Sequence, residues 1–248
     1  MKMKPDYTTI YSDDDIVVVN KRSGLLVAGD RWNPEAPRLD KMVEKEFGKI
    51  YAVHRIDKDT SGLVLYARNA DVHRSLSLAF QERDVHKVYH AIVYGRPEWE
   101  ELSVDLPLKV DGDERHRTVV NKRFGKPSKT DFKLLAIAGP FSIIECTLFT
   151  GRTHQIRVHL AANGLQIVCD PLYSGNQKAI KLSEIKRSWR GDPFEERPLL
   201  SRLGLHAYKL ELKHPVTGKQ LSFVAPYSKD MGSLINQLTK IFHLEPFN

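Results

Sequence analysis

The pattern of apolar and polar residues predicts a chain built largely from short strands. Runs rich in β-branched and aromatic residues, bounded by glycine, proline or acidic residues, are typical of buried strands. Such runs occupy residues 16–19, 63–67, 86–95, 130–138, 141–149, 205–212 and 220–224. The dipeptide Gly139-Pro140 separates two of these runs, which predicts an antiparallel hairpin.

Apolar residues recur at helical spacing in four other segments, and this spacing predicts amphipathic helices. The segments are residues 38–47, 69–83, 151–164 and 234–242. Asn69 or Asp71 is a suitable N-cap for the second helix, and Asn163-Gly164 is a suitable end for the third. Arg152 would then lie in the first turn of the third helix.

Acidic, basic and turn-forming residues come together in residues 54–62, His-Arg-Ile-Asp-Lys-Asp-Thr-Ser-Gly, between a predicted helix and a predicted buried strand. A loop that ends in Ser-Gly and leads into a core strand holds a charged group still at the edge of a rigid scaffold. We therefore interpret Asp57 as the catalytic residue. The alternative is ordinary turn chemistry with exposed charges.

Arg152 is locally unfavourable at the start of a helix, because the helix N-terminus already carries a partial positive charge. The placement is explained if an anion binds there, either a carboxylate such as Asp57 or a phosphate. An arginine beside Asp57 would also favour the ionised carboxylate. The alternative is an arginine that simply extends into water.

Composition favours a polyanionic partner. The 248 residues are 41% hydrophobic and 28% charged, as in ordinary soluble globular proteins, and their formal net charge is +7. Clustered lysine and arginine gain affinity by releasing counterions from phosphates, so nucleic acid is the first candidate and an anionic membrane surface the second. We expect a soluble protein, because residues 1–6 lack the apolar segment of a secretion signal and no apolar run approaches the ~18 residues of a membrane span.

Cys146 and Cys169 lie in apolar surroundings without C-x-x-C spacing, which indicates reduced thiols in a cytoplasmic protein rather than a disulfide or a zinc site. Two basic segments supply candidate RNA contacts. Residues 110–130 predict a basic hairpin or loop, and residues 174–204 predict an insertion with a short basic amphipathic helix around Trp189. The alternatives are a solvated turn for the first segment and packing of Trp189 onto the body for the second. The candidate contacts are Arg115, Arg117, Lys122, Arg123, Lys186 and Arg187.

Several segments together resemble the RluA-type pseudouridine synthases, which act on uridines of ribosomal and transfer RNA. Residues 54–62 resemble the family signature H-R-L-D-x-x-T-S-G, in which the aspartate is catalytic. The other matching segments are residues 14–21, 87–89, 151–160, 205–207 and 214–218. Their order and spacing hold over residues 14–225.

The resemblance implies an α+β fold, with a mixed and mainly antiparallel sheet flanked by helices and loops around an RNA-binding cleft. It implies that Asp57 is catalytic, that Arg152 pairs with it and that Tyr89 stacks on the uracil or helps to remove its proton. Arg55 would insert where the flipped base had been, and His54 would also contact RNA. We expect a single catalytic domain over residues 1–248, without a separate N-terminal RNA-binding domain, a cofactor, a metal or an obligatory protein partner.

Three alternatives remain open. A glycoside hydrolase could use Asp57 and Asp59 as a carboxylate pair, although the positive net charge gives no reason to expect a neutral sugar. A non-catalytic RNA-binding protein could keep the same fold. A metal site built from His54, His154, His159 and His206 is disfavoured, because the spacing of these histidines does not align them on one helix face.

Overall fold

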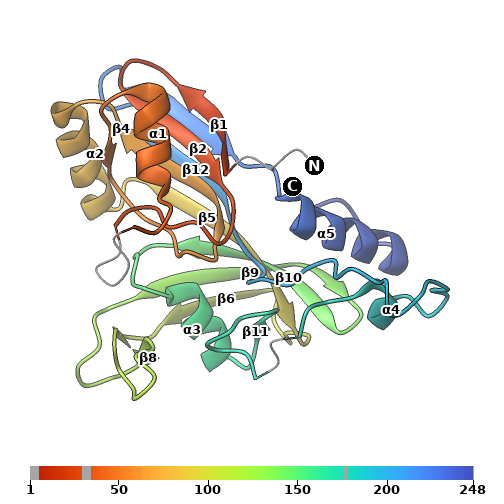
Figure 1. Ribbon diagram of the computed structural model, residues 1–248. Helices are drawn as coiled ribbons and strands as arrows, with labels where there is room; N and C mark the ends of the chain where they lie inside the picture. Colours follow the sequence, from red (N-terminus) through yellow and green to blue (C-terminus); the bar gives the residue numbers. More distant parts are fainter. Residues whose placement is uncertain (1–5, 30–34, 176–177, 248) are drawn as a thin grey trace. The chain divides into compact units, whose positions relative to one another are not determined.

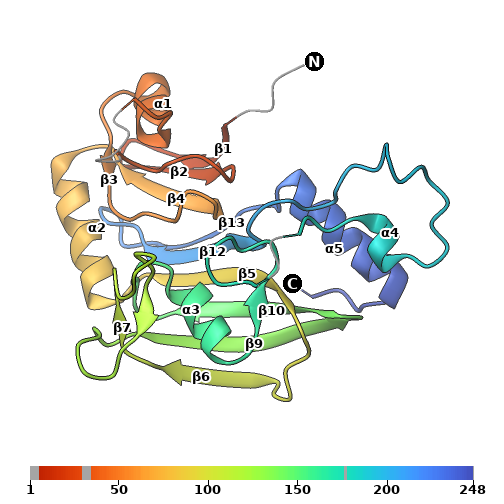
Figure 2. The ribbon, with the colours of Figure 1, turned by 60° about the horizontal axis from the view of Figure 1, so that its bottom comes forward.

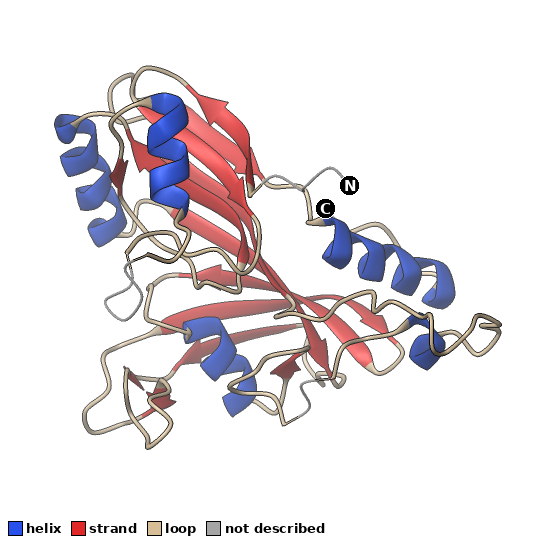
Figure 3. Cartoon of the chain, in the orientation of Figure 1, coloured by secondary structure: helices blue, strands red, loops and turns tan. Residues whose placement is uncertain are grey.

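The computed structural model describes residues 6–29, 35–175 and 178–247. Strands make up most of its regular structure and helices flank them, so the predicted α+β fold class is confirmed (Figure 3). The chain divides into two compact units, described separately below. The first contains the residues up to Val88 together with His206–Pro226, and the second contains Tyr89–Leu205 and the residues from Tyr227 onward.

The first unit is built on a sheet with the strand order β1-β2-β4-β12-β13, and a short strand β3 also pairs with β4. Every pairing is antiparallel except that of β4 with β12, which is parallel. The strands are β1 Tyr7–Ser12, β2 Ile16–Lys21, β3 Tyr51–Ala52, β4 Ser61–Ala67, β12 Leu205–Lys213 and β13 Gln220–Val224. Every residue of β4 is buried, which makes it a rigid support for the loop that precedes it.

Helices α1 (Leu39–Phe47) and α2 (Ala70–Glu82) lie beside this sheet (Figure 1). The Asn69 side chain caps α2 by accepting the backbone N–H of Val72 at 2.9 Å, as the sequence predicted. Apolar residues of α2 pack against alternate residues of β2 and β4 and against β12 and β13 in one core cluster. Alternate residues of β2 and β4 therefore face α2, as expected for strands whose successive side chains point to opposite faces of the sheet.

The second unit contains most of β5 (His86–Tyr94) and a sheet with the order β5-β10-β9-β6. Its other main strands are β6 Glu101–Asp105, β9 Lys129–Ala138 and β10 Phe141–Leu148, and β11 Gln166–Ile167 pairs with β5. The predicted antiparallel hairpin across Gly139-Pro140 is confirmed. Short strands β7 Leu108–Lys109 and β8 Val119–Val120 form a separate antiparallel pair, which confirms a basic hairpin in this region.

Three helices belong to the second unit: α3 Gln155–Ala162, α4 Leu182–Ile185 and α5 Lys229–Phe242 (Figure 2). The predicted basic amphipathic helix in the insertion of residues 174–204 was partly wrong, because α4 is a single turn without lysine or arginine. Lys178 and Lys181 precede this turn, and Lys186, Arg187 and Arg190 follow it. Residues 176 and 177 of this insertion lie outside the described ranges. Among the described residues, no helix combines the length and the apolar character required to cross a membrane.

Candidate active site

The loop that carries Asp57 lies directly before β4 in the first unit. Ile56 is buried and anchors the loop in the core, whereas Asp57 is half-buried and Arg55 is exposed. The backbone N–H of Thr60 donates to the carbonyl oxygen of Asp57 at 3.2 Å and closes the turn. A side chain on a turn fixed at both ends keeps its position, which general acid–base or nucleophilic chemistry requires.

A buried lysine fixes the backbone of this loop through hydrogen bonds. The ammonium group of Lys21, at the end of β2, is almost inaccessible to solvent and donates to three carbonyl oxygens. These belong to Arg22 (3.0 Å), Leu25 (2.7 Å) and Lys58 (2.9 Å). Ser23 and Gly24 add hydrogen bonds to the carbonyl oxygens of Asp59 (2.7 Å) and Lys58 (2.8 Å). Sequence reasoning missed this role, and its only local signal is a lysine at the end of an apolar strand.

The Ser61-Gly62 end of the loop is fixed by β12. Ser61 Oγ lies 2.9 Å from His206 Nδ1, and His206 Nε2 lies 3.2 Å from the carbonyl oxygen of Ala225. Because a carbonyl only accepts, His206 carries its proton on Nε2 and accepts the Ser61 hydroxyl on Nδ1. Gly62 has φ +113°, and a Cβ there would lie 2.2 Å from the carbonyl oxygen of Ala207. The Ser-Gly pair is therefore required by the close approach of two parallel strands.

His54 has a structural role in the same loop. Its Nε2 accepts the backbone N–H of Leu65 at 2.9 Å, and its ring stacks on Phe80 with the centroids 4.8 Å apart. Burial, with a smaller effect of the nearby Lys87 ammonium, lowers the pKa of His54 to about 3. The ring is therefore neutral at physiological pH and offers RNA no positive charge. Its predicted contact with RNA stays a prediction.

Arg152 lies in the second unit, in the segment between β10 and α3. Its predicted place in the first turn of a helix was wrong, because α3 begins at Gln155 and the N-cap is His154, in the left-handed region at φ 57°. The physical reason is that the Gln155 side chain accepts the backbone N–H of Arg152 at 3.0 Å, so this segment caps the helix instead of entering it. The guanidinium Nε lies 3.4 Å from the carbonyl oxygen of Pro127.

Gln155 organises a buried polar chain behind Arg152. Its Oε1 also accepts the hydroxyl of Thr150 at 2.7 Å, and its Nε2 donates to the carbonyl oxygen of Lys129 and to Thr130 Oγ1, both at 2.9 Å. Thr130 in turn hydrogen-bonds His159 Nδ1 at 2.9 Å. Gln155 is 2% exposed, and its hydrogen bonds with Thr150 and Thr130 are buried away from water.

Replacing Gln155 by leucine is expected to lower the free energy of unfolding by about 2–4 kcal/mol, because several buried donors and acceptors lose their partner. Urea denaturation followed by circular dichroism measures the change. The same substitution at Gln166, which is exposed on β11, provides the control and should change stability by less than about 0.5 kcal/mol. Equal effects at the two positions would contradict the role of Gln155.

Arg152 also lines a groove of about 450 Å³ next to the β7–β8 hairpin. Lys109 and Lys126 contribute two further cations to this groove, and no carboxylate lines it. Phe124 lies at its edge with 64% of its surface exposed, and the Arg123 guanidinium lies 4.9 Å from the centre of the Phe124 ring. Sequence reasoning did not select Phe124, although an aromatic residue within a basic segment is a signal for nucleic-acid binding.

The remaining predicted RNA contacts differ in their surroundings. Arg117 is held by Asp113, with Nε 2.8 Å from Oδ2, and donates to the carbonyl oxygen of Leu172 at 2.9 Å, so it has a structural role in the hairpin. The other predicted contacts are exposed: Arg115, Lys122, Arg123, Lys186 and Arg187. Exposure is necessary for a phosphate contact, and their contact with RNA stays a prediction.

Tyr89 is 8% exposed and lies in β5. Asp57 belongs to the first unit, whereas Tyr89 and Arg152 belong to the second. The predicted ion pair of Asp57 with Arg152, with Tyr89 beside it, would therefore form between residues of different units. It stays a prediction.

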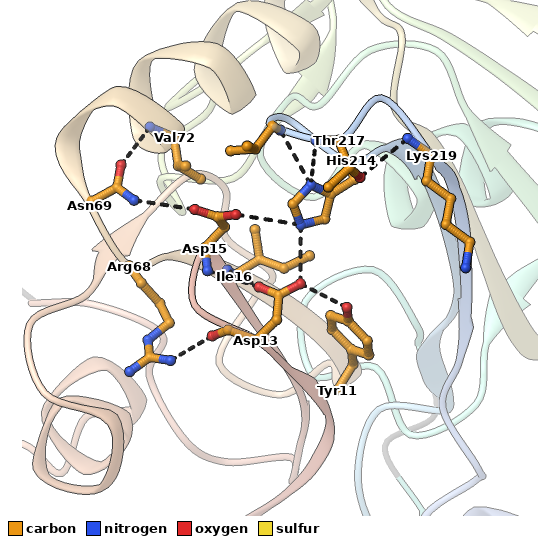
Figure 4. A network of polar contacts seen from close by, with 11 residues as sticks. Tyr11, Asp13, Asp15, Ile16, Arg68, Asn69, Val72, His214, Thr217 and Lys219 are labelled. Carbon is orange, nitrogen blue, oxygen red and sulfur yellow. Dashed lines mark hydrogen bonds and ion pairs between the residues drawn. The ribbon is translucent and has the colours of Figure 1, made fainter.

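Asp13, Asp15 and His214 form the group of described residues whose atoms come close enough to hold a cation (Figure 4). His214 Nδ1 accepts the backbone N–H groups of Val216 (3.2 Å) and Thr217 (3.1 Å), so the proton of the neutral ring lies on Nε2 and points to Asp13 Oδ2 at 3.0 Å. A protonated nitrogen does not ligate a metal. We conclude that this network joins the β1–β2 turn to the β12–β13 turn by hydrogen bonds.

Comparison with known proteins identifies the class. The family described as RNA pseudouridylate synthase matches residues 15–162, which is more than half of the chain. Among solved structures, Human RNA Pseudouridylate Synthase Domain Containing 1 has a TM-score of 0.67 at 27% identity, over 91% of this chain and 86% of that one. The chain belongs to the RNA pseudouridine synthase family, the isomerases that convert uridine in RNA. The predicted family and enzyme class are confirmed.

Two curated relatives show how far the similarity extends. The dual-specificity RNA pseudouridine synthase RluA of Escherichia coli (strain K12) is 33% identical over 224 residues, 90% of this chain and 94% of that protein. Ribosomal large subunit pseudouridine synthase D of Neisseria meningitidis serogroup B is 35% identical over 236 residues. That match covers 92% of this chain but 60% of the relative, so the chain spans less than two thirds of the Neisseria protein.

Proposed function

We propose that this chain isomerises specific uridines of structured ribosomal or transfer RNA to pseudouridine, with the Asp57 carboxylate as the catalytic group. The observation that carries the proposal is the construction of the Asp57 loop. Its backbone is held by Lys21, Ser23 and Gly24 on one side and its end is fixed by the pairing of β4 with β12. The reaction itself, isomerisation of uridine to pseudouridine, is inferred from the family to which the chain belongs.

The reaction requires three steps and no change of oxidation state. The bond between the ribose and nitrogen 1 breaks, the uracil turns, and carbon 5 joins the ribose. Carbon 5 then loses its hydrogen as a proton, and nitrogen 1 takes up a proton. A carboxylate serves either by attacking as a nucleophile or by removing the 2′-hydrogen, and both routes require the ionised form. Asp57 is half-buried, which limits water at the reacting atoms while leaving the carboxylate accessible to a nucleotide.

Three further residues complete the proposed site. Arg152 would pair with the Asp57 carboxylate, and Tyr89 would stack on the uracil or assist the loss of the proton from carbon 5. A base in structured RNA must first leave its stack, at a cost of a few kcal/mol. Arg55, which is exposed beside Asp57, would occupy the position that the base leaves.

The exposed basic residues would bind phosphates of the substrate RNA. We propose that Arg115, Lys122 and Arg123 of the hairpin do so, together with Lys186 and Arg187 of the insertion. Arg117 would contribute through the shape of the hairpin, because its guanidinium already binds Asp113. We further propose that residues 1–248 act as one catalytic domain in the cytoplasm.

The proposal is tested by incubating the protein with ribosomal and transfer RNA that carries tritium at carbon 5 of uridine. Isomerisation replaces the carbon–hydrogen bond at carbon 5, so we expect tritium to appear in water in proportion to the pseudouridine formed. Binding of these RNAs without release of tritium would instead support the alternative of a non-catalytic RNA-binding protein.

A further inference from the structure

A second basic groove lies in the second unit, formed by α4, the residues that follow it, the end of α5 and the β9–β10 turn. Its volume is about 740 Å³, within the range of ligand-binding clefts. Both Figure 1 and Figure 2 show α4 beside α5, and these two helices are in contact. The proposed chemistry at Asp57 does not use this groove, although Lys186 and Arg187, which are proposed above to bind phosphates, line it.

The floor of the groove is apolar and its rim is positive. Ile185 and Phe242 line the floor and pack against the core of this unit. Three exposed cations line the groove: Lys186, Arg187 and Lys240. The only carboxylate among the lining residues is that of Glu184, whose Oε2 accepts the backbone N–H of Lys181 at 3.2 Å and so faces the start of α4.

The groove lies far from Arg152 within the same unit. The backbone of β9 binds the Arg152 segment at Lys129, whereas the Gly139-Pro140 turn at the other end of the β9–β10 hairpin lines the groove. Phe242 lies against this turn, since a Cβ at Gly139 would come 2.4 Å from its ring. Strand β9 has ten residues, which corresponds to about 30 Å between its ends. This separation is of the order of one turn of an A-form RNA duplex.

We propose that this groove is a second RNA-binding site, which takes the sugar–phosphate backbone of the substrate about one duplex turn away from the uridine that reacts. The inference rests on the proposed function, because it assumes that the same RNA reaches Arg152. Three cations against one engaged carboxylate favour a polyanion over a protein segment, and the apolar floor accepts the sugar face or an unpaired base.

The site predicts that affinity depends on the length of the RNA. Two RNAs with the same modified loop are compared, one with a short stem and one with its stem extended by at least one duplex turn. Wild-type protein is expected to bind the extended RNA at least about tenfold more tightly at ~0.1 M salt. The double variant Lys186→Glu/Lys240→Glu is expected to bind both RNAs alike, with a salt dependence reduced by about two phosphate contacts.

A matched control separates the groove from net charge. Lys133 and Lys229 are exposed in the same unit and do not line the groove, so Lys133→Glu/Lys229→Glu makes the same change in net charge. This control should keep the preference for the extended RNA, and Lys186→Gln/Lys240→Gln should lose part of it. The proposal is overturned if wild-type protein shows no preference, or if both charge-reversal variants lose it equally. Tritium release by the wild-type protein is measured separately, so failure of the reaction and failure of the groove are distinguishable.

Discussion

Replacing Asp57 by asparagine is expected to lower kcat for pseudouridine formation by at least about a thousandfold. The amide has nearly the shape of the carboxylate, so the loop held by Lys21 should keep its conformation while the group loses its charge and its ability to attack or to accept a proton. Release of tritium from carbon 5 measures the rate. Unchanged thermal unfolding of the variant would show that chemistry and not folding has been lost.

Asp59 provides the matched control, because the same substitution is made two residues away in the same turn. Its contribution to the loop is through its backbone carbonyl oxygen, which accepts the Ser23 hydroxyl, and asparagine retains that carbonyl. Asp59→Asn is therefore expected to keep most of the activity. The glycoside hydrolase alternative, which requires both carboxylates, predicts similar losses for the two variants. Full tritium release by Asp57→Asn would overturn the proposed role of Asp57.

Replacing Gly62 by alanine is expected to lower the free energy of unfolding by at least about 3 kcal/mol. Two costs act together, since the backbone has φ +113° and the added methyl group would meet the backbone of Ala207 at 2.2 Å. The neighbour is backbone held in parallel pairing with β4, so it cannot turn away as a flexible side chain could. Urea denaturation followed by circular dichroism gives the stability.

Gly218 separates these two costs. It also has positive φ, +69°, but nothing lies within 4 Å of an added Cβ. Gly218→Ala should therefore cost only the backbone strain, about 1–2 kcal/mol. If Gly62→Ala were no more destabilising than Gly218→Ala, the close approach of β4 and β12 would not be the reason for the glycine.

The elements that the sequence predicted well are those with a buried face and a local boundary signal. Strand β4 is an uninterrupted apolar run, α2 begins at a capping asparagine, and the β9–β10 hairpin turns at Gly139-Pro140. Strand β1, Tyr7–Ser12, was missed because none of its residues is fully buried, although its tyrosines and threonines favour a strand. A strand of this kind is specified by its partner β2 more than by its own residues.

The candidate site was also predictable only in part, because some of its contacts leave no signal in the local sequence. Asp57 and Arg152 were selected because a charged residue in an unfavourable or confined place is visible in the sequence. Lys21 contacts Lys58, and Gln155 contacts Thr130. Each contact joins residues more than twenty positions apart, so no local sequence pattern predicts it. The start of α3 was misplaced because a side-chain amide, rather than helical spacing, determines where that helix begins.

The hydrogen bond between Ser61 and His206 has a consequence for the order in which the protein forms during synthesis. Its two residues are 145 positions apart, and the first unit lacks β12 and β13 until residues 206–226 have been made. At typical translation rates of ~5–20 residues per second, this interval lasts about 7–30 s. During that time the Asp57 loop has been made but the strand that fixes its end has not, and the ribosome is adding residues 89–205 of the second unit. With Asp57 in its proposed role, a newly made chain is therefore expected to gain activity only after residues 206–226 have been translated.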